Sequence, residues 1–323
     1  MADVTREVKK YLDKISLLQN QKEELRRSRE ALADQIKDHF REEGRKIPDF
    51  KQQGSFDMGT IIQPIDGEYD LDYGVYLQGY SDDEDEWPAP ATVHNWIIDA
   101  VKNHTQTDPE NKKTCVRVIY KGNYHIDLPI YIESESKCKL AHLEKGWIQS
   151  QPKDITLWFQ EQINDKGIAL RDVVKILKGW ADYQDDKYGK MPSGLVLTIL
   201  AADNFVDRDR LDECVYETVK GIYWQIKDQV EIYNPADPNE KISDRLSDQV
   251  KHRFQEKVKT LADDLKAACK EESFAQSSKL WNEKFGDRFP IASDPDEEQK
   301  KNITILIEKY GNAKTIKPWG YKF

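Results

Sequence analysis

The chain begins with a long segment suited to a helix, because residues 3–43 contain neither proline nor glycine. Apolar residues recur there at gaps of three, four and seven, as at Val8 and Tyr11. Such spacing places the apolar side chains on one face of a helix. We therefore predict one long helix that lies across the back of a domain and ends at Gly44, since glycine suits the position just after a helix. The apolar stripe is narrow and is interrupted at residues 19–23, which argues against a coiled coil.

Two blocks with different residue patterns follow this helix. From about residue 48 short β-type runs alternate with turns, and after Pro152 the pattern is helical. We expect strands at 60–62 and 71–77, a helix at 91–104, and a hairpin of 115–120 and 124–132 around a turn at 121–123. Further helices are expected at 154–164, 168–184, 193–204, 209–233, 242–270 and 295–309. The fold class is therefore α+β, with a first domain over residues 1–150 and a helical domain over residues 151–323.

The composition excludes several classes of protein. Lys and Arg number 49 against 59 Asp and Glu, a net charge of −10, whereas binding of long nucleic acid needs clustered Lys and Arg. No window approaches ~18 apolar residues, so we expect no membrane span, and the N-terminus lacks the pattern of a secretion signal. The four cysteines never form a Cys-x-x-Cys motif. They indicate reduced thiols of a cytoplasmic protein and no zinc site.

A pair of aspartates lies at the start of the expected strand at 71–77. Asp70 and Asp72 are two residues apart, so on a strand their side chains share one face, with Cα atoms about 6.5 Å apart. Carboxylates placed in this way can bind a pair of metal ions, the arrangement used for phosphoryl or nucleotidyl transfer. Their hard oxygen ligands favour Mg²⁺ or Mn²⁺ over zinc. An isolated Asp-x-Asp is more often a solvated turn, so this motif needs support from elsewhere.

The segment before this pair supplies a candidate phosphate-binding turn. Gln53, Gly54 and Ser55 precede the aspartates by about fifteen residues. Glycine allows close approach of the backbone to a phosphate, and the N–H groups and the serine hydroxyl can bind an anion. No lysine follows in the manner of a Walker-type loop. A simple turn remains the alternative.

A third aspartate lies inside an otherwise apolar strand. Asp127 is flanked by Ile126 and Leu128, and burial of a lone carboxylate costs several kcal/mol unless a cation compensates it. His125 shares the face of Asp127 and is either a structural residue or a partner of the site. The Gly-Ser turn, the Asp-x-Asp strand and a later aspartate are more specific together than separately.

In this order the motifs resemble those of the polymerase-β-type nucleotidyltransferases. The details are most similar to the cGAS/DncV-like nucleotidyltransferases (CD-NTases) of bacterial antiphage systems, and to their DncV-type branch. The resemblance rests on five segments, Gln53–Phe56, Asp70–Leu77, His125–Ile130, Val173–Trp180 and Met191–Leu197, and reaches Asn234. It implies a nucleotidyltransferase core with the long N-terminal helix as a spine, joined to an oligoadenylate-synthase-like helical domain that closes the active-site cleft.

The same resemblance implies an activity and a set of site residues. The family makes cyclic di- or trinucleotides, such as cyclic GMP-AMP, from ATP, GTP or other nucleoside triphosphates and releases pyrophosphate. These second messengers serve cyclic-oligonucleotide antiphage (CBASS) defence, in which accessory or regulatory proteins of the same system are possible partners. By motif match Asp70, Asp72 and Asp127 bind two Mg²⁺ ions. Nucleotide-binding roles fall, by the same match, on Gln53, Gly54, Ser55, Lys178, Ser193 and Asn234.

The residues themselves leave alternatives open at three of these positions. Lys178 follows an apolar helical stripe, so a solvated helix lysine is as reasonable as a phosphate ligand. Ser193 follows Pro192 and suits a helix N-cap, although a helix N-terminus also favours anions. Asn234 as a reader of a base rests on the resemblance alone.

Two other functions compete with a cyclic nucleotide synthase. A template-free enzyme with linear products, such as an oligoadenylate synthase or an RNA 3′-end nucleotidyltransferase, needs a basic groove for RNA. The only candidates for such a groove are Lys112, Lys113, Arg117 and Lys121. The second rival is a non-catalytic module that senses a nucleotide, but such a module has little need of three clustered carboxylates.

Overall fold

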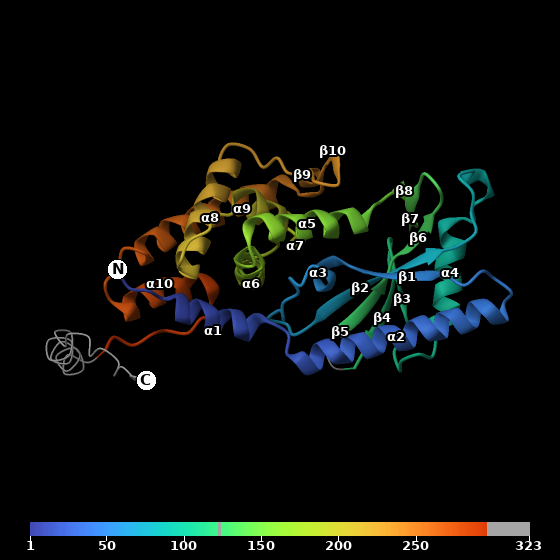
Figure 1. Cartoon of the computed structure of the whole chain (residues 1–323), viewed down its shortest axis with the longest axis horizontal. Helices are drawn as coiled ribbons and strands as arrows, with labels where there is room; N and C mark the ends of the chain where they lie inside the picture. Colours follow the sequence, from blue (N-terminus) through green and yellow to red (C-terminus); the bar gives the residue numbers. More distant parts are fainter. Residues whose placement is uncertain (122–123, 296–323) are drawn as a thin grey trace, which may run out of the picture.

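The computed structural model describes residues 1–121 and 124–295. A sheet forms one half of the molecule and a group of helices the other, and one long helix runs along the sheet (Figure 1). This is the expected α+β fold. No helix of the described part is long and apolar enough to cross a membrane.

The N-terminal region forms two helices, where the sequence predicted one. They are α1 (Thr5–Ile15) and α2 (Gln19–Glu42). The chain is extended at Ser16 and Leu18, and the side chain of Gln21 accepts a hydrogen bond of 2.7 Å from the Leu18 backbone N–H, which starts α2 afresh. The break lies just before the predicted interruption of the apolar stripe. Gly44 follows α2 with a φ of +68°, so the predicted C-terminal glycine is confirmed.

Eight strands form one mixed sheet beside α2. They are β1 (Asp49–Gln53), β2 (Tyr69–Leu77), β3 (Glu110–Asn111), β4 (Val116–Tyr120), β5 (Tyr124–Leu128), β6 (Ile130–Glu133), β7 (Cys138–His142) and β8 (Gly146–Gln149). β2 pairs in parallel with β5 and β6 and antiparallel with β1. The predicted strand at 71–77 and the predicted hairpin are confirmed. Pro129 divides the predicted strand at 124–132, since proline has no N–H to donate.

Short helices and turns complete the first 150 residues. These are α3 (Gly54–Asp57), the 3₁₀ turn η1 (Glu84–Glu86) and α4 (Pro90–Val101), which confirms the helix expected at 91–104. The strand expected at 60–62 is wrong, because these residues pair with no strand. They form instead a connection between α3 and β2, and Thr60 within it is completely buried.

The remaining described residues are mostly helical. The helices are α5 (Pro152–Lys166), α6 (Ala169–Tyr188), α7 (Gly194–Asn204), α8 (Leu211–Ile226), α9 (Asp248–Ala268) and α10 (Phe274–Phe285). Between α8 and α9 lie β9 (Tyr233–Asn234), β10 (Asp237–Lys241) and the 3₁₀ turn η2 (Ile242–Arg245). The expected helices at 209–233 and 242–270 are therefore shorter than predicted, and α10 was not predicted. The helix expected at 295–309 falls, apart from residue 295, outside the described residues.

Buried apolar side chains form two main clusters, one in each half. The helical cluster contains Tyr11, Trp180 and Trp281, together with residues of α6 to α10. The sheet cluster contains Leu25 and Leu71 and takes in residues of α2, α4 and the strands. The apolar face of α1 therefore packs against the helices, whereas that of α2 packs against the sheet.

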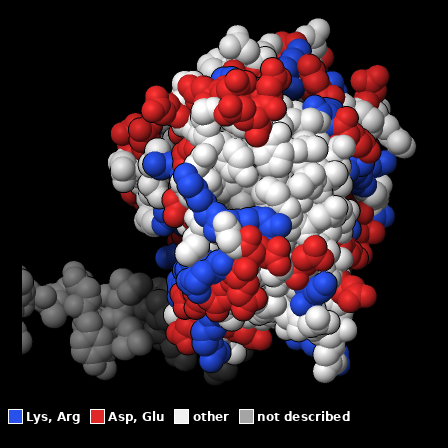
Figure 2. Space-filling view, turned by 90° about the vertical axis from the view of Figure 1, so that its right-hand side faces the viewer, with Lys and Arg blue, Asp and Glu red and all other residues white. Residues whose placement is uncertain are grey.

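Charged side chains of both signs are mixed on the surface. Figure 2 views the end of the molecule near α4 and β8, where Lys and Arg lie among Asp and Glu around an area that carries neither. Acidic side chains stand beside the basic ones across this face.

Candidate active site

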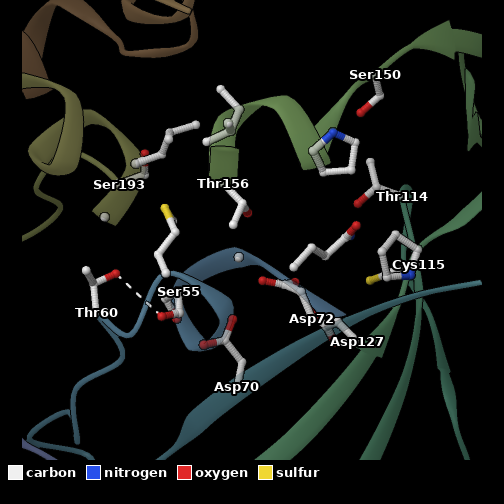
Figure 3. Close-up of a pocket in the computed structure, with 18 of the residues that line it drawn as sticks. Ser55, Thr60, Asp70, Asp72, Thr114, Cys115, Asp127, Ser150, Thr156 and Ser193 are labelled. Carbon is white, nitrogen blue, oxygen red and sulfur yellow. Dashed lines mark hydrogen bonds between the residues drawn. The ribbon is translucent and has the colours of Figure 1, made fainter. Parts of the chain in front are cut away.

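One cavity of about 980 Å³ lies where the sheet half meets the helical half. The cavity floor is formed by the strands, and the start of α7 lies across from it (Figure 3). Every residue that the sequence proposed for the site lines this cavity: Gln53, Gly54, Ser55, Asp70, Asp72, Asp127, Lys178, Ser193 and Asn234. Residues far apart in the chain are thus brought to one place.

The three aspartates lie side by side on β2 and β5. Asp70 and Asp72 share one face of β2, and Asp72 stands opposite Asp127 in the parallel register. Ligand atoms of Asp70, His125 and Asp127 all lie within 4.8 Å of one another, so these residues form a group that could hold a metal ion. Carboxylate oxygens suit Mg²⁺ or Mn²⁺, and the imidazole nitrogen widens the range to other divalent ions. His125 therefore lies in the candidate metal site, whereas the sequence alone left its role open.

Asp72 lies slightly apart from that group and faces the phosphate-binding turn. A Cβ atom added at Gly54 would overlap the Asp72 carboxylate, and Gly54 also has a φ of +71°. Only glycine meets both demands without strain. The sequence attributed Gly54 to phosphate approach alone, but the structure adds the contact with Asp72 as a second reason.

Burial and like charge act together on Asp72. Burial is the main cause that raises the pKa of its carboxyl to about 7, and the charges of Asp70 and Asp127 add to the rise. Arg117 and Lys178 oppose it. A carboxylate held in this way gains from any cation that binds beside it. The electrostatics of the floor therefore favour a bound cation.

Arg117 already supplies one positive charge at this floor. Its Nε and one terminal nitrogen donate to the two oxygens of Asp127 at 2.8 and 2.9 Å, and this bonding raises the pKa of the guanidinium. Sequence reasoning considered Arg117 only as part of a basic edge. The predicted hairpin contained the missing signal, because a hairpin centred on residue 122 sets Arg117 directly opposite Asp127, as observed.

Gln53 supports the turn from behind. Its amide donates to the Tyr131 hydroxyl at 3.0 Å and accepts from the Tyr76 hydroxyl at 3.4 Å. Both ends of the amide are engaged by the protein. This geometry suits a residue that orients Gly54 and Ser55 better than one whose side chain holds a nucleotide.

Lys178 reaches the cavity from α6 and is buried. Its ammonium group donates to the Thr60 hydroxyl at 3.0 Å and to the Thr60 carbonyl at 3.3 Å. Burial lowers its pKa to about 8, although the charges of Asp70 and Asp72 raise it in part. The alternative of a solvated helix lysine does not fit this burial.

Ser193 and Asn234 differ in how free their side chains are. Ser193 occupies the N-cap position of α7, but its side chain makes no capping hydrogen bond and is exposed at the cavity. The capping role expected from the sequence is therefore not filled by its hydroxyl. The Asn234 amide donates to Glu240 at 2.6 Å and accepts from the Ala236 N–H at 2.9 Å. A base-reading role for Asn234 would require these bonds to rearrange.

Comparison with known proteins agrees with this geometry. Residues 48–131, which hold the turn and all three aspartates, match the nucleotidyltransferase domain of the cyclic GMP-AMP synthase DncV-like family. A cyclic GMP-AMP synthase of Escherichia albertii is 30% identical over 205 residues, which are 60% of this chain and 45% of the relative. A c-di-GMP synthase of Roseivirga ehrenbergii is 24% identical over 231 residues, 59% of each protein. The chain thus spans about half the length of these relatives.

Solved structures share the fold over most of the chain. The Vibrio cholerae DncV cyclic AMP-GMP synthase in complex with nonhydrolyzable GTP superposes with a TM-score of 0.73 at 21% identity, covering 86% of this chain and 93% of that one. Its complex with the linear intermediate 5′ pppA(3′,5′)pG gives the same values. The sequence match thus places the core over residues 48–131 in the DncV-like nucleotidyltransferase domain family, and the shared fold extends over both halves of the chain.

Proposed function

We propose that this protein is a cyclic dinucleotide synthase that joins nucleoside triphosphates, such as ATP and GTP, and releases pyrophosphate. One observation carries the proposal. Three aspartates on the sheet, the Gly54–Ser55 turn and the buried ammonium of Lys178 all face a single cavity that is large enough for two nucleotides.

The aspartates would bind metal and handle the proton. Two Mg²⁺ ions, or Mn²⁺, held by Asp70, Asp72 and Asp127 would neutralise charge on the phosphates and lower the pKa of the attacking hydroxyl. Asp127 accepts the proton of the ribose hydroxyl as general base, with Asp70 beside it. Formation of the ring needs a second transfer of the same kind, after the linear intermediate has turned around in the cavity.

Phosphate binding falls to residues on the two sides of the cavity. Backbone N–H groups of the Gly54–Ser55 turn and the Ser55 hydroxyl bind the donor triphosphate. Lys178 supplies a positive charge, and the Ser193 hydroxyl and the start of α7 supply hydrogen-bond donors. Lys178 has only the two Thr60 oxygens as acceptors among the described residues, so its third N–H is free to donate to a phosphate.

The named relatives support the choice of substrate and product. Several are synthases of cyclic GMP-AMP or c-di-GMP, and one solved neighbour holds a linear pppApG intermediate. We extend to this chain ATP and GTP as substrates, a cytoplasmic location and a role in antiphage (CBASS) signalling with proteins of the same system. The division into a core over residues 1–150 and a closing helical domain over 151–323 belongs to the same proposal.

The partners of the basic side chains support a cyclic product over a linear product made on RNA. The side chains proposed for a basic groove are paired or bonded, with Lys112 on Glu110 at 2.6 Å, Lys113 on Glu144 at 2.7 Å, Arg117 on Asp127 and Lys121 on Gln106. These four residues leave no free basic edge. A purely sensory module remains the other alternative, and turnover separates it from an enzyme.

The test is a product assay with the purified protein, all four triphosphates and Mg²⁺. We expect pyrophosphate release and a phosphatase-resistant nucleotide whose mass identifies a cyclic dinucleotide. EDTA, or Asp70→Ala combined with Asp72→Ala, should abolish both signals. A phosphatase-sensitive ladder would support the linear-product rival, binding without turnover would support the sensory module, and full activity of the double variant would refute the assigned site.

A further inference from the structure

Thr60 connects two parts of the cavity that come from opposite halves of the molecule. It lies in the connection between α3 and β2, is completely buried and lines the cavity. On one side it contacts the phosphate-binding turn, because its backbone N–H donates to the Ser55 carbonyl at 2.8 Å. Its hydroxyl donates to the same carbonyl at 3.5 Å (Figure 3).

On its other side Thr60 receives the ammonium group of Lys178. The hydroxyl and the carbonyl of Thr60 are the two acceptors of Lys178 among the described residues, at 3.0 and 3.3 Å. A buried ammonium requires acceptors, since an unpaired one carries a large desolvation penalty. Thr60 therefore fixes where the Lys178 charge stands relative to Ser55.

A third contact confines the stem of the lysine. A Cβ atom added at Gly194, the first residue of α7, would lie 2.9 Å from Lys178 Cε. The stem thus runs against the start of α7 while its tip is held by Thr60. Lys178 thus lies between Thr60, which is bonded to the Gly54–Ser55 turn, and the N-terminus of α7. The turn and this helix N-terminus are the two elements assigned to phosphate binding above.

We propose that Thr60 is a positioning residue, which ties the Lys178 ammonium to the Gly54–Ser55 turn so that both bind the same triphosphate. The proposal rests on the proposed function, because it assumes that the cavity binds a nucleoside triphosphate. Thr60 itself need not touch the substrate. Its hydroxyl orders the charge before the substrate arrives, and such preorganisation favours binding.

Two substitutions separate the hydroxyl from the rest of the side chain. Thr60→Val keeps the volume and the backbone bonds but removes the Oγ1 acceptor of Lys178, whereas Thr60→Ser keeps that acceptor. The matched control is Thr218→Val in α8, since Thr218 is also completely buried and its hydroxyl accepts a bond from the Val206 N–H, away from the cavity lining.

Two measurements are made on wild type and on each variant. Calorimetry gives the Kd of a nonhydrolysable triphosphate analogue, and steady-state kinetics give KM and kcat for the natural triphosphates. We expect Thr60→Val to raise Kd and KM about tenfold, the size of a hydrogen bond to a charged group, with kcat changed less than threefold. Thr60→Ser and Thr218→Val should stay within twofold of wild type. In a Lys178→Met background, Thr60→Val should have little further effect, because the group that it positions is gone.

The other outcomes distinguish failure of the role of Thr60 from failure of the proposed function. Equal Kd values for wild type and Thr60→Val, or fully additive effects in the Lys178→Met background, would overturn the role of Thr60. A loss of thermal stability shared by Thr60→Val and Thr218→Val without a change in Kd would mean that the hydroxyl is merely structural. Binding of the analogue without turnover would refute the proposed function and leave the Kd comparison for Thr60 intact. Absence of binding by wild type would overturn both.

Discussion

At the scale of single residues, Lys178 shows how burial prepares a group for its ligand. The side chain loses most of its hydration and, within the described part of the chain, gains only the oxygens of Thr60 as acceptors. Desolvation therefore lowers its pKa to about 8, the carboxylates of Asp70 and Asp72 oppose this shift, and the nearby charge of Lys175 adds to it. A bound triphosphate would favour the protonated form of Lys178, because its negative charge would pair with the ammonium group.

This shift predicts a pH dependence of substrate capture. The protonated lysine binds phosphate, so kcat/KM for the triphosphate should fall as the pH rises through about 8, with most of the loss between about pH 7 and 9. Lys178→Met should have a lower kcat/KM without this fall. A wild-type profile that stays flat to pH 9.5 would contradict the assignment. The free energy of unfolding should rise over the same range, because the unfolded chain still holds the proton that the folded one has lost.

At the scale of elements, α1 packs closely against α6 and α10 in the helical half. Tyr11 of α1 lies edge-on to Phe285 with ring centroids 5.3 Å apart. Beneath it, a Cβ atom at Gly179 of α6 would lie 2.5 Å from the Tyr11 hydroxyl and 2.8 Å from Ile15 Cδ1. Gly179 is therefore required by close packing of the two helices and not by its backbone angles.

Gly179→Ala should destabilise the protein despite the better helix propensity of alanine. Overpacking of this kind costs about 1–3 kcal/mol, more than the roughly 1 kcal/mol that alanine contributes in a helix. Thermal or denaturant unfolding measures the difference. Gly221→Ala in α8 is the comparison, since the nearest atoms there belong to the half-buried side chain of Asn204, and it should destabilise the protein less than Gly179→Ala. Equal effects of the two substitutions would refute the packing argument.

At the scale of the whole molecule, Arg288 joins the two halves. It donates to the Gln63 carbonyl at 2.9 Å, to the Gly179 carbonyl at 3.3 Å and to Asp182 at 2.5 Å. Asp182 also accepts from the Ile65 N–H at 3.0 Å. The connection that leads to β2 is thereby fastened to α6, and Asp182 lines the cavity at this joint.

Arg288→Met should therefore loosen the sheet half from the helical half. We expect a loss of about 2 kcal/mol in the free energy of unfolding, because the pair is only partly exposed and Asp182 would lose its cation. A thermal scan should show a lower and broader transition. Arg41→Met removes a fully surface pair with Asp38 and should change little. An unchanged transition for Arg288→Met would show that the halves are held by apolar contacts alone.

Local patterns in the sequence predicted the parts of the fold that depend on neighbouring residues. The alternation around Asp70 and Asp72 and the apolar run around Asp127 were sufficient to predict β2, β5 and the shared face of the aspartates, since side chains on a strand alternate. The helix break at Ser16 was missed because it depends on what each helix packs against. Contacts across long separations, such as Thr60 with Lys178, leave no local pattern.

Two misses have more specific causes. α10 was overlooked because its start signal was not used: Ser273 accepts a capping bond from the Gln276 N–H at 3.0 Å, and serine is a common N-cap residue. The tyrosines that hold Gln53 come from β2 and β6 and could not be assigned before the sheet order was known. The domain boundary near residue 150 stays a prediction.

The packing of α1 also sets an order of events during synthesis. The Ala2 N–H donates to the Glu271 carbonyl, the Val4 N–H to Asp212, and Tyr11 contacts Phe289. α1 thus has partners that are made about two hundred residues or more after it. All eight strands of the sheet have been synthesised by residue 149, so the sheet can fold before the partners of α1 exist. The N-terminal helix is therefore among the last elements to reach its place, and until then its apolar face is open to chaperones or to other chains.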